Sequence, residues 1–286
     1  MRAGRTFLGG CSGLLAFIFA CLVAELPTLA AESAKTVTIH QVPPAVKKTI
    51  ESQSMGFKLG NIEMDCDDSE VTYTTTITKE GRDSDFTVAE DGRLLSVELT
   101  LEEAPAAVQK TIKAQLGQGE LDSLENNLEE NTYEIEYTRK DGTDGYFSVK
   151  EDGKLLTVQV ALAEVPPVVR KTIEANLGKG KLGNVYRTTE NGEVSFDAEV
   201  SFEEKQREMS IAENGKLESM QVFLAEAPEP VQKTIREKLG SGKLIRIDHS
   251  FVPDRGVLPY EIEARKDGKP FNFSVGPKGR FLGMDE

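Results

Sequence analysis

The sequence predicts an α+β fold made of four tandem repeats of about 62 residues. Three observations indicate it. The triplet Lys-Thr-Ile begins at Lys48, Lys110, Lys171 and Lys233, with offsets of 62, 61 and 62 residues. Apolar residues with helical spacing surround each triplet, and segments of alternating apolar and polar residues follow it. We therefore expect each repeat to be one helix packed on an antiparallel meander sheet of three to four strands.

The repeats follow one another without a Gly/Ser-rich linker. A unit of this size buries only roughly 60% of its unfolded surface and is marginally stable alone. We therefore expect neighbouring copies to be coupled stiffly, through shared sheet edges or packing. The predicted division is a leader over residues 1–30, then repeats over residues 31–101, 102–162, 163–224 and 225–286.

The leader has the features of an export signal. Arg2 and Arg5 precede an apolar run from Phe7 to Ala24, and small residues end the segment. We expect cleavage after Ala30 or Ala31. The mature chain is then expected in the periplasm or outside the cell.

The alternative is a chain anchored to the membrane by its N-terminus. The apolar run approaches the roughly 18 residues of a spanning helix, although several glycines dilute it. Cys11 and Cys21 follow sequences that weakly resemble lipoprotein cleavage boxes. No later segment is apolar enough to span a bilayer. The mature chain would keep only Cys66, which excludes an intrachain disulfide; we expect this thiol to fill a small site near a strand end.

Each predicted helix begins near a proline and ends before a glycine, which suits a first turn and a C-cap. The glutamates just upstream, Glu103, Glu164 and Glu226, are expected to interact with the positive end of the helix dipole. The first copy departs, with Ser54 in the third apolar position. The apolar stripes of the other copies are Val108, Ile112 and Leu116; Val169, Ile173 and Leu177; and Val231, Ile235 and Leu239.

Strand signals follow each helix. In the second copy Tyr133, Ile135 and Tyr137 alternate with polar residues, and later hairpins are indicated by Asp91-Gly92, Asp152-Gly153 and Asn214-Gly215. Residues 37–42 resemble the segments before the other three helices. We therefore expect a strand to enter every helix, including the first, so that the packed unit is β-α-β-β-β.

Composition excludes some partners. The net charge is −14, and removal of the leader makes it −15 because two arginines and one glutamate are lost. Nucleic acid and anionic lipid both require clustered lysine and arginine, so neither is expected as a partner. An acidic surface instead speeds the encounter with a basic partner.

The sequence offers no catalytic, metal or cofactor site. His40 and His249 have no partner at metal-ligand spacing. The acidic cluster over residues 65–70 lacks the calcium-loop pattern; we expect a solvated turn, with weak cation binding as the alternative. Two histidines support no Ser-His-Asp set. We therefore predict a protein that is not an enzyme.

Several motifs together resemble the PepSY-like domain. They are Pro-x-x-Val-x-Lys-Thr-Ile, then Gly-x-Gly-x-Leu, a Tyr-Glu-Ile-Glu strand over Tyr133–Glu136, and Glu-Asp-Gly-Lys-Leu-Leu over Glu151–Leu156. The resemblance covers about residues 37–286 in four copies. It implies an exported, non-catalytic protein, similar in fold to the β-lactamase inhibitory protein, that binds proteins or peptides; peptidase inhibition is proposed for some members. This chain departs from that inhibitor in having no tryptophan and no cysteine pairs.

The outward face of the sheet is the expected binding surface. Gln159, Gln221 and Phe223 alternate with buried positions there, and Phe223 stands where the earlier copies have Thr100 and Ala161. We expect Phe223 to pack on a neighbouring repeat or to contact a partner. The leading hypothesis is a binding or inhibitory module for an envelope protein or peptide. The alternative is a structural or weakly cation-binding acidic envelope protein without a specific partner.

Overall fold

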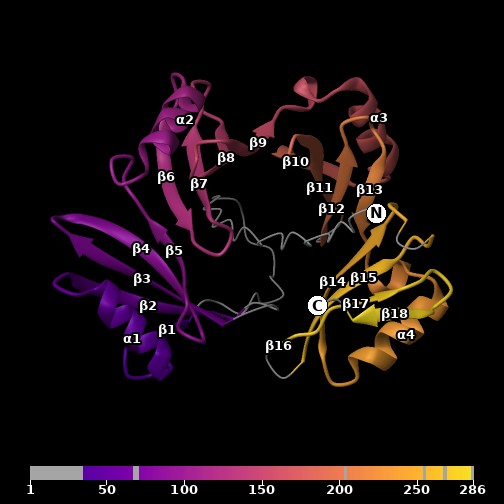
Figure 1. The fold of residues 1–286 in the computed structure, drawn as a ribbon, viewed down its shortest axis with the longest axis horizontal. Coiled ribbons are helices and arrows are strands. Elements are labelled where there is room, and N and C mark those ends of the chain that lie inside the picture. Colours follow the sequence, from indigo (N-terminus) through magenta and orange to yellow (C-terminus); the bar gives the residue numbers. More distant parts are fainter. Residues whose placement is uncertain (1–34, 67–70, 203–204, 254–255, 267–268, 285–286) are drawn as a thin grey trace, which may run out of the picture. The chain divides into compact units, whose positions relative to one another are not determined.

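The structure is a computed structural model that describes residues 35–66, 71–202, 205–253, 256–266 and 269–284. The predicted leader lies outside these residues. The described chain forms four α-helices and one 18-stranded antiparallel sheet (Figure 1). The helices are α1 (Pro44–Gln53), α2 (Ala106–Leu116), α3 (Pro167–Asn176) and α4 (Glu229–Leu239), and the short 3-10 helices are η1 (Leu162–Glu164) and η2 (Leu224–Glu226).

The strands of the sheet are β1 (Lys35–Val37), β2 (Lys58–Cys66), β3 (Val71–Lys79), β4 (Arg82–Ala89), β5 (Leu94–Glu98), β6 (Glu120–Asn127), β7 (Thr132–Thr138), β8 (Asp144–Lys150), β9 (Leu155–Val160), β10 (Lys181–Glu190), β11 (Glu193–Phe202), β12 (Lys205–Ala212), β13 (Leu217–Gln221), β14 (Lys243–Ser250), β15 (Tyr260–Lys266), β16 (Lys269–Pro270), β17 (Phe273–Val275) and β18 (Phe281–Met284).

Strands pair in chain order. Each strand from β1 to β15 lies antiparallel to the next, β15 also pairs with β16 and β17, and β17 pairs with β18. The strand before each later helix pairs on both sides: β5 with β4 and β6, β9 with β8 and β10, and β13 with β12 and β14. The predicted α+β repeats are therefore confirmed, and they share sheet edges.

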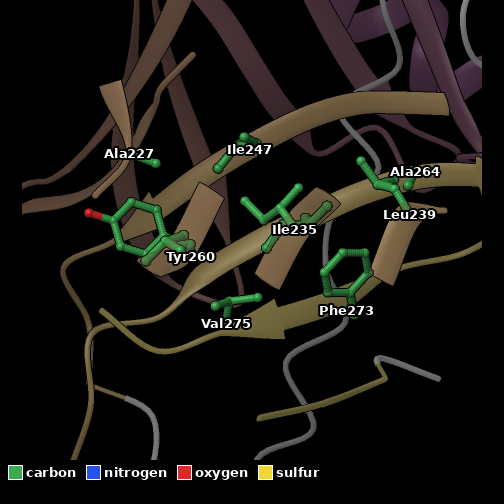
Figure 2. Packing of buried hydrophobic residues seen from close by; sticks show 10 residues of the cluster. Ala227, Ile235, Leu239, Ile247, Tyr260, Ala264, Phe273 and Val275 are labelled. Atoms are coloured by element: carbon green, nitrogen blue, oxygen red, sulfur yellow. The ribbon is translucent and has the colours of Figure 1, made fainter. Parts of the chain in front are cut away.

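Four separate hydrophobic cores lie between the helices and the sheet. Each core takes the buried stripe of one helix and the apolar side of the strands around it. Figure 2 shows the fourth, in which Ile235 and Leu239 of α4 meet Ile247 of β14, Tyr260 of β15 and Phe273 of β17. The helical stripe predicted from the sequence is thus the helix side of each core.

The linking strands contribute to two cores each. In β9, Val158 packs in the second core, whereas Val160, two residues later, packs in the third. In the same way Met220 belongs to the third core and Val222 to the fourth. Burial in one repeat therefore depends on the placement of a strand that the next repeat also holds.

The helix ends follow the sequence. The glycines after the last three helices, Gly117, Gly178 and Gly240, have φ of 56°, 58° and 53°. A residue with a Cβ is strained at such angles, so glycine ends the helix there. In the first repeat Ser54 takes the end position instead, and its hydroxyl donates to the Ile50 carbonyl at 2.7 Å.

A recurrent contact fixes each helix to the hairpin opposite it. The threonine of the Lys-Thr-Ile triplet donates its hydroxyl to a glycine carbonyl in the hairpin turn, at 2.6 Å in all four repeats. The same glycines have φ between 79° and 90°. A Cβ on any of them would lie 2.5–2.9 Å from backbone of the first helical turn. The pairs are Thr49 with Gly92, Thr111 with Gly153, Thr172 with Gly215, and Thr234 with Gly279.

One expectation about the segments before the helices is wrong. No described strand enters a helix directly; β9 and β13 lead into η1 and η2, and β1 ends at Val37. The upstream glutamates fold these turns, because Glu164 Oε2 accepts the Ala161 N–H at 2.9 Å and Glu226 Oε2 accepts the Phe223 N–H at 2.9 Å. β1 does pair with β2, as the β-α-β-β-β unit requires.

Candidate functional site

Alternation along the strands gives the sheet an apolar side and a polar side. In β7, Tyr133 and Ile135 are buried in the second core, so Glu134 and Glu136 lie on the other side. We call the side opposite the helices the polar face. The following residues point to this polar face: Glu134 (β7), Tyr146 (β8), Gln159 (β9), Asn184 and Tyr186 (β10), Asp197 and Glu199 (β11), Glu208 (β12), Gln221 (β13), and Arg246 and Asp248 (β14).

Two of the predicted partner-binding residues lie on this polar face. Gln159 is half-buried, donates to Asn184 Oδ1 at 2.8 Å and accepts from Arg139 Nη2 at 3.2 Å. Gln221 stands opposite Asp248 in the pairing of β13 with β14. Three strands, β10 to β12, separate the two glutamines, so the fold does not bring them together.

Phe223 lies beyond the end of β13, where strand alternation no longer applies. Its half-buried ring packs beneath Lys205 and Arg207, whose cationic groups lie 4.6 and 5.1 Å from the ring centroid. These two residues share the side of β12 that carries the buried Met209. Phe223 is therefore associated with the helix side of the sheet, within a cation–π contact.

The polar face has a partly buried polar cluster where the second and third repeats meet. The Tyr146 and Tyr186 rings lie edge to face, with centroids 5.9 Å apart. The Asn184 backbone N–H donates to Glu199 Oε2 at 3.3 Å. Tyr186 is only 8% exposed, and its hydroxyl has no hydrogen-bond partner among the described residues. Burial, reinforced by the charge of Glu199, raises the pKa of the Tyr186 hydroxyl.

Three carboxyl groups on the polar face are held in surroundings that disfavour their charge. Burial is the main cause of the raised pKa of Glu134, Asp197 and Glu199. A hydrogen bond to Ser210 opposes the effect at Asp197, and the negative charge of Glu208 adds to it at both Asp197 and Glu199. The register explains this repulsion, because Glu199 pairs directly with Glu208.

A single arginine gathers acids where the third and fourth repeats meet. Arg246 donates to both carboxylate oxygens of Asp248, at 2.6 and 3.0 Å, and to Glu208 at 2.7 Å. Burial lowers the pKa of the guanidinium, but the bonds and charges of Asp248 and Glu208 outweigh it, so the pKa is raised. The arrangement ties β12 to β14 across β13 with a charge-assisted, partly bidentate contact.

Sequence reasoning missed the tyrosines and Arg246. One signal was available: counted from the leucine that ends each apolar stripe, Asn184 and Arg246 occupy the same place, seven residues after Leu177 and Leu239. The meeting of Tyr146 with Tyr186 had no local signal, because it depends on the pairing of β9 with β10.

The other candidate groups are scattered. Cys66 ends β2, but its thiol is exposed, so the expectation of a small filled site is wrong. His249 stacks on Tyr260 with centroids 4.3 Å apart, and burial lowers its pKa. Asp65 is exposed, and the rest of the acidic cluster, residues 67–70, lies outside the described residues. Among those described, no group of three acids, histidines or cysteines has a metal-binding arrangement.

No α-helix among the described residues is both long and apolar enough to cross a bilayer. A protein-family model described as "Putative beta-lactamase-inhibitor-like, PepSY-like" matches residues 30–96 and again residues 94–157. These two matches correspond to the first two repeats. A comparison with curated proteins gives no match.

Several solved structures of similar proteins come from Bacteroides species. A "putative periplasmic" protein from Bacteroides eggerthii is 17% identical, with 40% of this chain and 86% of that chain covered at a TM-score of 0.32. A BLIP-like protein from Bacteroides fragilis is 14% identical, with 40% and 82% covered at a TM-score of 0.30. A "putative periplasmic protein of unknown function" from Bacteroides vulgatus is 14% identical, with 46% and 99% covered at a TM-score of 0.31.

Proposed function

We propose that this chain, which matches a PepSY-like family model over residues 30–157, is an exported, non-catalytic protein that binds an envelope protein or a peptide through the polar face of its sheet. A peptidase is one class of such a partner. The observation that carries the proposal is the polar face itself. Every core in the described residues lies on the helix side, so the opposite side supplies polar groups that the fold does not consume in packing.

The chemistry of this face suits recognition better than solvation alone. Exposed strand positions usually carry polar groups that are fully hydrated. In contrast, the carboxyl groups of Glu134, Asp197 and Glu199 are already partly desolvated in the free protein, which disfavours their charged forms. Tyrosines held edge to face are rigid and amphipathic, as contact residues of protein interfaces often are. These features support binding without indicating a reaction.

Export rests on the leader. The basic start, the apolar run and the small residues near Ala30 support cleavage and delivery to the periplasm or the medium. Gln159 and Gln221 would then contact the partner from the polar face. Phe223 lies on the helix side beyond the end of β13, so it would contact a partner only outside the polar face.

The test is affinity capture from envelope extract with the purified protein as bait. We expect one saturable partner whose capture is weakened by Gln159→Lys and Gln221→Lys. Phe223→Asp tests whether the contact extends beyond the polar face, past the end of β13. The matched control is Lys171→Asp on the exposed side of α3, which should leave capture unchanged. Equal loss with the helix variant, or no saturable partner, would contradict the proposal. A clear gain in melting temperature with calcium, and no partner, would instead favour the cation-binding alternative.

A further inference from the structure

The junction between the second and third repeats lacks a cation that the junction between the third and fourth repeats has. Seven residues after the helix-ending leucine, the fourth repeat has Arg246 and the third has Asn184. Two residues further on, the fourth repeat has Asp248 and the third has Tyr186. The comparison of these matched positions indicates what each junction lacks.

Arg246 shows how this fold holds a guanidinium group. Its three hydrogen bonds run to Asp248 and Glu208, and its side chain is 22% exposed. The strand position opposite Arg246 on β15 is Glu263. At the preceding junction the residue that corresponds to Glu263 is Glu199. The backbone N–H of Asn184 donates a hydrogen bond to its carboxylate.

Glu199 has its acidic surroundings but no cation. Among the described residues no lysine or arginine lies within ion-pair distance of it, while its strand neighbour Glu208 is already bound to Arg246. Arg139 approaches this junction, but its guanidinium stops at Gln159. Arg246 therefore offsets the negative charge of Glu208, whereas no cation among the described residues offsets the charge of Glu199.

The aromatic groups beside Glu199 also suit a cation. Tyr186 and Tyr146 take the places that Asp248 and Glu208 hold at the next junction. Ring faces attract ammonium and guanidinium groups, most strongly where water is excluded. The buried Tyr186 hydroxyl lies beside the Asn184 and Glu199 side chains but makes no hydrogen bond of ordinary geometry among the described residues, so its oxygen can accept one.

We propose that this cluster, formed by Tyr146, Asn184, Tyr186 and Glu199, binds the guanidinium of an arginine side chain presented by a partner polypeptide. The inference rests on the proposed function, because it names the chemistry of the partner at the polar face. The arginine fills the place that Arg246 fills within the chain at the next junction. Glu199 supplies the opposite charge, and the tyrosine pair borders the cation on one side.

The experiment is an NMR titration of the protein with acetyl-Gly-Arg-Gly-amide, followed at Tyr186 and Asn184. The control peptide carries citrulline in place of arginine, which keeps the shape and removes the charge. We expect the arginine peptide to bind at least tenfold more tightly. Glu199→Gln should weaken binding by about tenfold, as expected for the loss of one charge-assisted contact. The matched control Glu63→Gln, an exposed acid on β2 of the first repeat and away from this cluster, should leave the affinity unchanged.

A second variant tests the site without a ligand. Asn184→Arg places within the chain the side chain that Arg246 provides at the next junction. We expect a higher melting temperature than wild type and no remaining response to the arginine peptide. Equal binding of the two peptides, no effect of Glu199→Gln in a folded variant, or destabilisation by Asn184→Arg would overturn the inference. If these tests fail while envelope capture still depends on Gln159 and Gln221, the proposed function stands and the arginine site falls.

Discussion

Four threonines, one in each repeat, explain why the Lys-Thr-Ile triplet recurs. The isoleucine enters the core, and the threonine hydroxyl binds the carbonyl of the hairpin glycine at 2.6 Å. The lysine is exposed in the third repeat. The contact joins residues about 43 apart in the sequence, so it fixes where the hairpin lies against the helix. The glycine is required twice over, by its positive φ and by its approach to the helix backbone.

Gly215→Ala tests that approach, and Gly192→Ala is its matched control. Both glycines have φ near 83° in turns of the third repeat, but only Gly215 has helix backbone within 4 Å of the Cβ position, with Val168 O at 2.9 Å. We expect Gly192→Ala to cost about 1 kcal/mol from backbone strain alone. Gly215→Ala should cost about 3 kcal/mol, because overpacking adds to that strain. Urea unfolding measures both, and equal costs would show that the contact is unimportant.

Asp197→Asn tests whether burial on the polar face disfavours the charge of this carboxyl, through the pH dependence of stability. A carboxyl whose pKa is raised on folding binds protons more tightly in the native state, so stability falls as pH rises from the ordinary value of 3.8 through the raised one. We expect the melting temperature of the variant to fall less than that of wild type over this range. Thermal unfolding at several pH values measures it. An identical pH profile would mean that Asp197 carries no burial penalty.

At the scale of the element, the linking segments change role within a few residues. Val158 and Val160 pack in different cores from one strand, and Leu162 then packs from η1. The turn that follows is closed by Glu164, which accepts the Ala161 N–H. Strand, turn and helix therefore succeed one another without a flexible connector.

Part of this could be read from the sequence, and part could not. The helices were predictable because Val169 and Ile173 keep a helical spacing between a proline and a glycine. The segment before the helix was mistaken for a strand because its apolar residues look alternating. In fact Leu162 and Val165 are three apart, which suits a 3-10 turn that directs both into the same core.

The candidate site was also predictable only in part. Alternation in β9 and β13 was enough to place Gln159 and Gln221 on the polar face. It failed for Phe223, because β13 ends at Gln221 and the chain turns into η2. The pairing of Tyr146 with Tyr186 joins two repeats, and the periodicity within one repeat carries no information about it.

The N-terminal strand provides a prediction at this scale. β1 pairs with β2 over three residues, and Val37 is buried in the first core. A chain that begins at Thr38 should lose about 2 kcal/mol of stability in the first repeat, from the exposure of this side chain and of the β2 edge. The control is a chain that begins at Lys35. Denaturant unfolding of the two chains compares them, and matching curves would argue against a β-α-β-β-β unit.

At the scale of the whole molecule, the junctions decide how far a disturbance travels. Each of β5, β9 and β13 pairs on both sides, so three junctions are continuous sheet. The third is reinforced by Arg246, which joins β14 to Glu208 of β12. Neighbouring repeats are therefore expected to unfold together more readily than independent domains would.

Arg246→Met tests this coupling. The variant leaves Glu208 and Asp248 without their cation, and we expect a loss of about 2 kcal/mol, lower than for fully buried pairs because Glu208 is 41% exposed. The loss should appear in the third and fourth repeats, followed by hydrogen exchange. Lys233→Met on α4 is the control, since its ion pair with Glu237 is largely exposed. Faster exchange confined to the fourth repeat would contradict coupling across β13.

Because β9 contributes side chains to two cores, it also limits how such an array can change its length during evolution. A duplication whose boundary falls within a linking strand divides a strand whose side chains belong to two hydrophobic cores. Each of the two repeats then loses part of its core packing. Duplication succeeds only when the break falls at the same place in two linking strands, for example after Val158 and after Met220, so that every new interior receives a full set of side chains. Such breaks lie 62 residues apart, the same interval that separates Lys171 from Lys233.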